Sequence, residues 1–121
     1  MGSPYNKINL SRILSAFKNS CHGLKNTFKN EEAFRQELIL TIILTPLAIY
    51  IGEDNIERIL LITSLLLLLM VELINTAIEA TVDRISYEKN ELSKLAKDIG
   101  SASVLIAFLN CFIVWIFILF L

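Results

Sequence analysis

The sequence contains few of the residues from which metal centres and redox sites are usually built. Its 121 residues include one histidine, His22, and two cysteines, Cys21 and Cys111. One histidine excludes a site made from several histidines, and two distant cysteines without a CxxC pair support neither a disulfide framework nor a zinc site. The chain also has only four glycines. It contains no G-x-x-x-x-G-K-S/T or G-x-G-x-x-G segment, so the recognised nucleotide-binding loops are absent.

The chain also lacks an excess of either charge. Its net charge is −1 at pH 7 and there is no acidic or basic tail, which excludes the electrostatic footprint of a nucleic-acid-binding protein. Apolar residues are abundant instead: 55% of the chain is hydrophobic and the mean hydropathy is +0.61. Soluble domains are roughly 45–50% apolar. The composition therefore predicts an integral membrane protein.

Apolar segments at about 33–52, 56–85 and 99–121 each reach at least the ~20 residues that a membrane-spanning helix requires. Residues 30–121 are therefore expected to form a domain of three transmembrane helices. Residues 1–29 differ, because after a polar start their apolar side chains recur at helical spacing opposite a basic face. This pattern predicts an amphipathic helix lying on the cytoplasmic membrane surface. Its apolar positions are Leu10, Ile13, Leu14, Phe17, Cys21, Leu24 and Phe28.

The distribution of Lys and Arg predicts the orientation in the membrane. The stretch around the first loop, Glu53 to Arg58, contains one such residue, Arg58. The segments before the first span and between the second and third are rich in them. By the positive-inside rule, the N-terminus and the second loop are cytoplasmic and the C-terminus is outside. The basic residues of the two cytoplasmic segments are Lys7, Arg12, Lys18, Lys25, Lys29 and Arg35, and Arg84, Lys89, Lys94 and Lys97.

The second span carries polar side chains where a simple membrane anchor would need none. Asn75 and Glu79 follow Glu72 at offsets of three and seven residues, which places all three on one helix face. Carboxylates inside a membrane helix are costly and usually functional. The alternative is a purely structural role, in which the three residues form hydrogen bonds between helices and stabilise an oligomer.

Further polar clusters are expected at the same cytoplasmic interface. Two carboxylates on different helices suit Mg²⁺, which binds one or two carboxylates together with substrate phosphates. A lysine suits phosphate, and a partly desolvated glutamate suits general base catalysis. Together these groups indicate phosphoryl transfer. The residues alone leave open a proton-coupled carrier or a non-enzymatic anchor. The clusters are Asn30-Glu31-Glu32, Arg35-Gln36-Glu37, Asp83-Arg84 and Lys97-Asp98.

Several of these residues also have simpler structural explanations. Lys97 can serve as an orienting charge at a helix end. Asp98 can act as the N-cap of the third span, and Glu31 can cap the first. Asp83 and Arg84 can pair with each other. These alternatives make definite predictions about helix ends and ion pairs.

Three segments of the chain resemble the prokaryotic integral-membrane diacylglycerol kinase family. They are AFRQE at 33–37, VELINTAIEATVDRIS at 71–86 and ELSKLAKDIGSASV at 91–104. The resemblance implies an all-α homotrimer in the bacterial inner membrane, with three spans and a surface helix in each subunit. It implies a kinase that uses ATP and Mg²⁺ to convert diacylglycerol into phosphatidic acid, in sites shared between neighbouring subunits. The nearest alternative is an undecaprenol kinase of the same family, although the AFRQE and DRIS blocks favour the proteobacterial diacylglycerol type.

The resemblance also implies roles for individual residues. Glu72 matches the catalytic base, Glu31 and Glu79 the metal-binding carboxylates near ATP, and Lys97 and Asp98 a pair that contacts ATP. Other positions expected near the nucleotide are Arg12, Asn19, Glu88, Lys89 and Asn90. Those expected to line or support the lipid site, besides Glu72, are Arg12, Lys25, Arg35, Glu37, Asn75, Ser101 and Trp115. The chain departs from the family pattern at Asn19-Ser20-Cys21, where many members carry a Tyr and a Trp around a Ser, and at Asn90, which replaces a common His.

Overall fold

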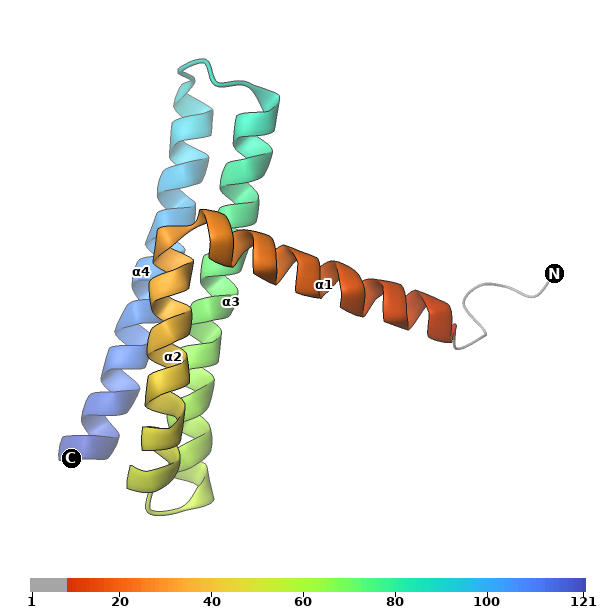
Figure 1. Ribbon diagram of the computed structural model, residues 1–121. Helices are drawn as coiled ribbons and strands as arrows, with labels where there is room; N and C mark the ends of the chain where they lie inside the picture. The colour runs from red at the N-terminus through yellow and green to blue at the C-terminus, as the bar shows by residue number, and fades with distance from the viewer. Residues whose placement is uncertain (1–8) are drawn as a thin grey trace.

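The computed structural model describes residues 9–121 and consists of four helices (Figure 1). They are α1 (Leu10–Asn30), α2 (Glu32–Ile51), α3 (Asn55–Ile85) and α4 (Glu91–Phe120). Residues 1–8, which include Lys7 and the polar start of the N-terminal segment, lie outside the described residues. Every regular element from residue 9 onward is an α-helix, so the all-α prediction is confirmed.

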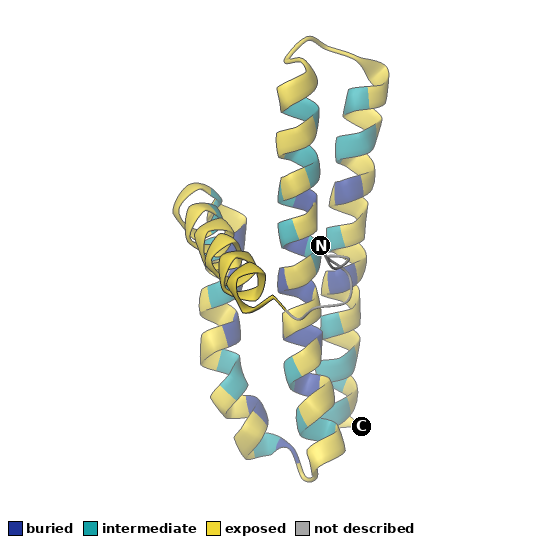
Figure 2. Cartoon of the chain, turned by 90° about the vertical axis from the view of Figure 1, so that its right-hand side faces the viewer, coloured by how far each residue is buried: buried dark blue, intermediate teal, exposed yellow. Residues whose placement is uncertain are grey.

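The helices α2, α3 and α4 run side by side, while α1 extends away from them at a steep angle (Figures 1 and 2). Helix α3 packs along α4 and against α2, and α1 contacts α2. Along α1 every residue is exposed except the half-buried Thr27. The α3–α4 hairpin continues past the junction of α1 and α2 (Figure 1). Its connecting loop therefore lies beyond the level of α1.

Helices α2, α3 and α4 are each long and apolar enough to cross a membrane, as predicted. The apolar core inside one chain is a narrow seam, in which Phe34, Leu61, Leu65 and Leu68 are almost completely buried. Most other large apolar side chains on these three helices remain exposed (Figure 2). Such a surface is unfavourable in water but suits a bilayer, where lipid is the surrounding solvent.

The helix ends correct two of the structural alternatives. Asn90 caps α4, because its Oδ1 accepts hydrogen bonds from the backbone N–H groups of Leu92 and Ser93. The helix of the third span consequently begins at Glu91 rather than near Ile99, and Asp98 is an interior residue and not an N-cap. Glu31 occupies the N-cap position of α2 but forms no capping hydrogen bond through its side chain. The prediction that the Glu31 carboxylate caps α2 is therefore wrong.

Candidate active site

The polar residues Glu72, Asn75 and Glu79 form a stripe along one face of α3. Glu72 and Asn75 are each 8% exposed, and Glu79, one turn further, is half-buried. Asn75 Nδ2 donates a hydrogen bond to Glu79 Oε1 at 3.4 Å. The helical spacing thus places the carboxylates of Glu72 and Glu79 about 10 Å apart along the helix axis. The Asn75 amide lies between them and is bonded to Glu79.

A second buried carboxyl group faces the stripe from α2. Glu37 is 7% exposed, and its carboxyl group lies close to that of Glu72. Glu37 Oε2 is buried without a hydrogen-bond partner among the described residues. Two buried carboxyl groups, one on α2 and one on α3, therefore lie side by side within the bundle.

Close packing of α4 on α3 fixes the position of Asn75. Asn75 Oδ1 is buried without a hydrogen-bond partner and lies directly against Gly100 of α4. A Cβ atom at Gly100 would overlap Asn75 Oδ1 and lie 3.3 Å from Asn75 Cγ. Only glycine leaves room for the side-chain oxygen here. The absence of a side chain on α4 therefore positions the amide whose nitrogen bonds to Glu79.

Glu31 and Glu79 line the same cavity, which we call the carboxylate cavity. It lies between the end of α1 and α3, has a volume of about 480 Å³, and is lined by polar side chains from both helices. Across residues 9–121, no three His, Cys, Asp or Glu side chains form a group able to hold a metal alone. Two carboxylates beside amide oxygens nevertheless fit Mg²⁺ bound together with substrate phosphates. The lining residues are Asn26, Thr27, Asn30, Glu31, Thr76, Glu79, Ala80, Asp83, Arg84 and Tyr87.

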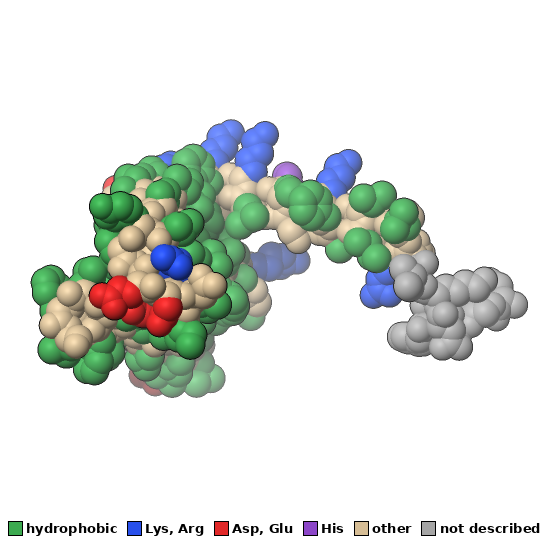
Figure 3. Space-filling view, turned by 90° about the horizontal axis from the view of Figure 1, so that it is seen from below, with side chains coloured by type: hydrophobic (Ala, Val, Ile, Leu, Met, Phe, Trp, Pro, Cys, Tyr) green, Lys and Arg blue, Asp and Glu red, His purple; other side chains and the backbone are tan. Residues whose placement is uncertain are grey.

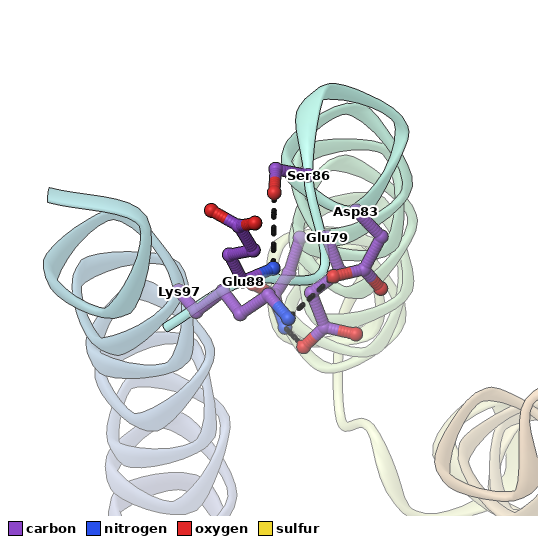
Figure 4. Close-up of polar contacts among 6 residues, drawn as sticks. Glu79, Asp83, Ser86, Glu88 and Lys97 are labelled. Atoms are coloured by element: carbon purple, nitrogen blue, oxygen red, sulfur yellow. Dashed lines mark hydrogen bonds and ion pairs between the residues drawn. The ribbon is translucent and has the colours of Figure 1, made fainter. Parts of the chain in front are cut away.

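A second cavity, the hairpin cavity, has a volume of about 590 Å³ and lies between the end of α3, the connecting loop and the start of α4. It brings together the five residues that the resemblance associates with the nucleotide in this region: Glu88, Lys89, Asn90, Lys97 and Asp98. Ser86 Oγ accepts a hydrogen bond from the backbone N–H of Glu88 at 3.0 Å, which holds the turn after α3 (Figure 4).

Lys97 connects the two cavities. Its side chain extends from α4 toward Asp83 and Glu79 on α3 (Figure 4), and its Nζ forms an ion pair with Asp83 Oδ1 at 2.6 Å. Asp83 lines both cavities. Its partner among the described residues is therefore Lys97 and not Arg84, which corrects the expected Asp83–Arg84 pair. A second ion pair on α4 joins Lys94 to Asp98 at 2.7 Å.

Replacing Asp83 by Asn is expected to change the free energy of unfolding by less than about 1 kcal/mol, because partly exposed ion pairs contribute little. The side chains of Lys97 and Asp83 are 41% and 36% exposed. Thermal unfolding of the wild type and Asp83→Asn in detergent micelles, at low and high salt, measures the contribution. A loss of several kcal/mol that persists in high salt would show that the pair is a main support of the hairpin.

Other predicted residues lie away from the cavities within one chain. Arg12, Asn19 and Lys25 are exposed along α1, and Ser101 is exposed on α4. Trp115 lies near the C-terminal end of α4. Its Nε1 donates a hydrogen bond at 3.3 Å to the backbone oxygen of Leu61, which is three turns before Glu72 on α3.

Arg35 is turned toward α1. Its Nη1 donates hydrogen bonds to the backbone oxygens of Phe28 and Lys29, and its guanidinium lies 6.0 Å from the Phe28 ring centroid. In this conformation Arg35 joins α1 to α2.

Four residues that the sequence did not single out contribute to these surroundings. Asn26 and Thr76 line the carboxylate cavity, Tyr87 lines both cavities, and Gly100 packs against Asn75. Asn26 is one turn before Glu31 and Thr76 one residue from Asn75, so their helical positions contained a usable signal. Tyr87 and Gly100 depend on contacts between α3 and α4, for which the local sequence contains no signal.

Comparison with known proteins gives a consistent result along the chain. Residues 18–119 match the family described as prokaryotic diacylglycerol kinase. The diacylglycerol kinase of Haemophilus influenzae is 51% identical over 116 residues, covering 96% of this chain and 98% of that protein. That of Pseudomonas aeruginosa is 46% identical over 110 residues, covering 91% and 89%. The Escherichia coli K12 protein is 45% identical over 114 residues, covering 94% and 93%.

These matches extend over α1, all three apolar helices and both cavities. A chance similarity or a shared single motif would not cover more than nine-tenths of both chains at 45–51% identity. The chain belongs to the prokaryotic diacylglycerol kinase family.

Proposed function

We propose that this protein is a diacylglycerol kinase that transfers the γ-phosphate of ATP to the free hydroxyl of diacylglycerol, giving phosphatidic acid and ADP. The observation that carries the proposal is the stripe on α3. It places a buried carboxyl group, Glu72, one turn from Asn75, whose amide bonds to Glu79 in the Glu31–Glu79 cavity. The curated relatives named diacylglycerol kinase, which match nearly the whole chain, support the same activity.

In the proposed reaction Glu72 accepts the proton of the lipid hydroxyl as its oxygen attacks the γ-phosphorus. The new O–P bond forms while the bond between the γ-phosphorus and the bridging oxygen breaks, and the electron pair leaves with ADP. Lys97 offsets negative charge on the phosphates, which is the main requirement of phosphoryl transfer. Glu31 and Glu79 would hold Mg²⁺, which would neutralise charge on the β- and γ-phosphates.

The site suits a reaction between a soluble and a membrane-bound substrate. Helix α1 leaves the bundle at a steep angle (Figure 1). Seen from the α2–α3 loop end, hydrophobic side chains cover much of α1 and Lys and Arg extend from its edges (Figure 3). We infer that α1 lies flat on the cytoplasmic surface of the bacterial inner membrane. This places Glu72 below the surface, where a lipid hydroxyl can reach it, and the hairpin cavity on the water side.

The working enzyme is proposed to be a homotrimer with sites shared between neighbouring subunits. The position of α1 supports this arrangement, because the helix that carries Arg12, Asn19 and Lys25 extends away from the bundle (Figure 1) and these residues are exposed. A neighbouring copy offers the nearest comparable site for them. The exposed apolar surface of α3 and α4 also leaves room for contacts between subunits.

One assay tests this function against its alternatives. Purified protein in mixed micelles with Mg²⁺-ATP is offered diacylglycerol or undecaprenol, and the phosphorylated lipid is quantified. Phosphatidic acid is the expected product. Preferential phosphorylation of undecaprenol would identify the other activity considered for this family. No phosphorylated lipid, together with pH-driven flux through the protein in liposomes, would instead indicate a proton-coupled carrier using Glu72.

A further inference from the structure

The two cavities of the α3–α4 hairpin have two lining residues in common, Asp83 and Tyr87. Asp83 pairs with Lys97, so it belongs to the charged part of the site. Tyr87 has no such role. It is the aromatic residue that borders both the carboxylate cavity and the hairpin cavity, and it is 88% exposed. A large apolar ring that stands open at the junction of two polar cavities needs an explanation.

The backbone around Tyr87 is held in place although its ring is exposed. Helix α3 ends at Ile85, the hydroxyl of Ser86 fixes the turn by accepting the N–H of Glu88, and Asn90 caps α4. Tyr87 also lines the hairpin cavity together with Lys97. The ring is therefore presented from a defined turn, next to the lysine that reaches toward Asp83 and Glu79 (Figure 4).

A membrane anchor is the usual explanation for an exposed tyrosine in such a chain, since Tyr is enriched at the membrane–water interface. The position of Tyr87 does not fit that role. The hairpin continues past the α1–α2 junction (Figure 1), and the next four residues, Glu88 to Glu91, are all polar and exposed. The ring thus lies on the water side, where a soluble ligand is available to it.

We propose that Tyr87 is the platform on which the adenine ring of ATP stacks, and that it determines the affinity for the base. The inference rests on the proposed kinase function and extends it. With its phosphates between Glu79 and Lys97, a nucleotide would have its base at the junction that Tyr87 borders. Stacking of a base on an aromatic side chain contributes about 1–3 kcal/mol.

The test compares Tyr87→Ala, Tyr87→Phe and a matched control, Tyr50→Ala. Tyr50 is 86% exposed and lies at the opposite end of the bundle, on α2. Tyr87→Ala is expected to raise the KM for ATP about 5- to 150-fold, which is the stacking contribution expressed as a ratio, with kcat nearly unchanged. Tyr87→Phe keeps the ring and should retain the wild-type KM, as should Tyr50→Ala.

Two further measurements separate stacking from other roles. Inorganic tripolyphosphate has no base, so its inhibition constant should be the same for the wild type and Tyr87→Ala. Equilibrium binding of ATP in micelles should weaken by the same factor as KM rises, and this readout does not depend on turnover. If the wild type binds ATP but phosphorylates no lipid, the proposed function fails while the stacking proposal is still tested by binding.

The proposal is overturned by any of three results. One is an unchanged KM and binding constant for ATP in Tyr87→Ala. Another is an equal loss for ATP and tripolyphosphate, which would indicate a change in the phosphate site. The third is a rise in the KM for diacylglycerol alone, which would assign Tyr87 to the lipid.

Discussion

Glu72→Gln is expected to lower kcat for phosphatidic acid formation by about 10²- to 10⁴-fold, the usual contribution of a general base. Glutamine has nearly the same size and can still form hydrogen bonds, but its amide cannot accept the proton of the lipid hydroxyl. Glu72 is 8% exposed, so no bulk water replaces it. The measurement is initial-rate formation of phosphatidic acid in mixed micelles at saturating Mg²⁺-ATP and diacylglycerol.

Glu37 provides the matched control for this experiment. Its carboxyl group is as buried as that of Glu72 and lies beside it. Glu37→Gln therefore makes the same chemical change at the neighbouring carboxyl group. The new amide can donate a hydrogen bond to the Glu72 carboxylate without a shared proton. We expect Glu37→Gln to keep kcat within about tenfold of the wild type. Oligomer size and thermal unfolding should be unchanged in both variants, because each replaces a side chain by its isostere.

The comparison between the two variants decides the assignment. If Glu37→Gln abolishes turnover and Glu72→Gln does not, the base is Glu37 on α2. If both variants are active, proton removal does not depend on this carboxyl pair. Glu79→Gln should also abolish turnover, but through the metal. Part of its loss should therefore be recovered at high Mg²⁺ concentration, which is not expected for Glu72→Gln.

The features that the sequence predicted well are those that follow from local periodicity. The second span was expected at 56–85 and α3 is observed at Asn55–Ile85, because an uninterrupted apolar run in a helix is unambiguous. The same periodicity placed Glu72, Asn75 and Glu79 on one face, and the structure links the last two by a hydrogen bond. The distribution of charges suggested that Lys97 is an orienting charge at a helix end. The structure places it inside α4 and paired with Asp83, which the charge distribution could not identify.

Features that depend on contacts between helices could not be predicted. The polar start of α4 gave no hydrophobic signal, so the helix was expected to begin near Ile99. The Asn90 cap instead starts it two turns earlier. The approach of Glu37 to Glu72 joins α2 to α3, and the position of Tyr87 between two cavities depends on how the hairpin folds back. Periodicity within one helix contains no information about such distances.

Gly100 shows this limit most clearly and leads to the second prediction. Gly100→Ala is expected to reduce activity about 10- to 100-fold, the usual cost of disturbing a residue that orients a metal ligand. A Cβ at this position would overlap Asn75 Oδ1, so Asn75 must move or α3 and α4 must separate. Either change removes the hydrogen bond from Asn75 Nδ2 to Glu79. Overpacking should also lower the free energy of unfolding by about 1–3 kcal/mol.

Gly23 supplies the control, because it is also a glycine within a helix but has open space around it, with nothing within 4 Å of an added Cβ. Gly23→Ala should leave activity unchanged and stabilise α1 by up to about 1 kcal/mol, the difference in helix propensity. If both variants lost activity equally, a general effect of alanine on helix flexibility would explain the result. Unchanged activity in Gly100→Ala would show that Asn75 can move without consequence for Glu79.

The double variant Asn75→Ala/Gly100→Ala separates packing from chemistry. Removing the Asn75 side chain makes room for the new methyl group, so thermal stability should recover toward that of Asn75→Ala alone. Activity should not recover, because the amide that bonds to Glu79 is missing in both. The Mg²⁺ concentration needed for half-maximal rate should rise in Gly100→Ala and remain high in the double variant. Recovery of activity together with stability would show that Asn75 serves helix packing alone. Of the polar stripe on α3, only Glu72 and Glu79 would then have a role in the reaction.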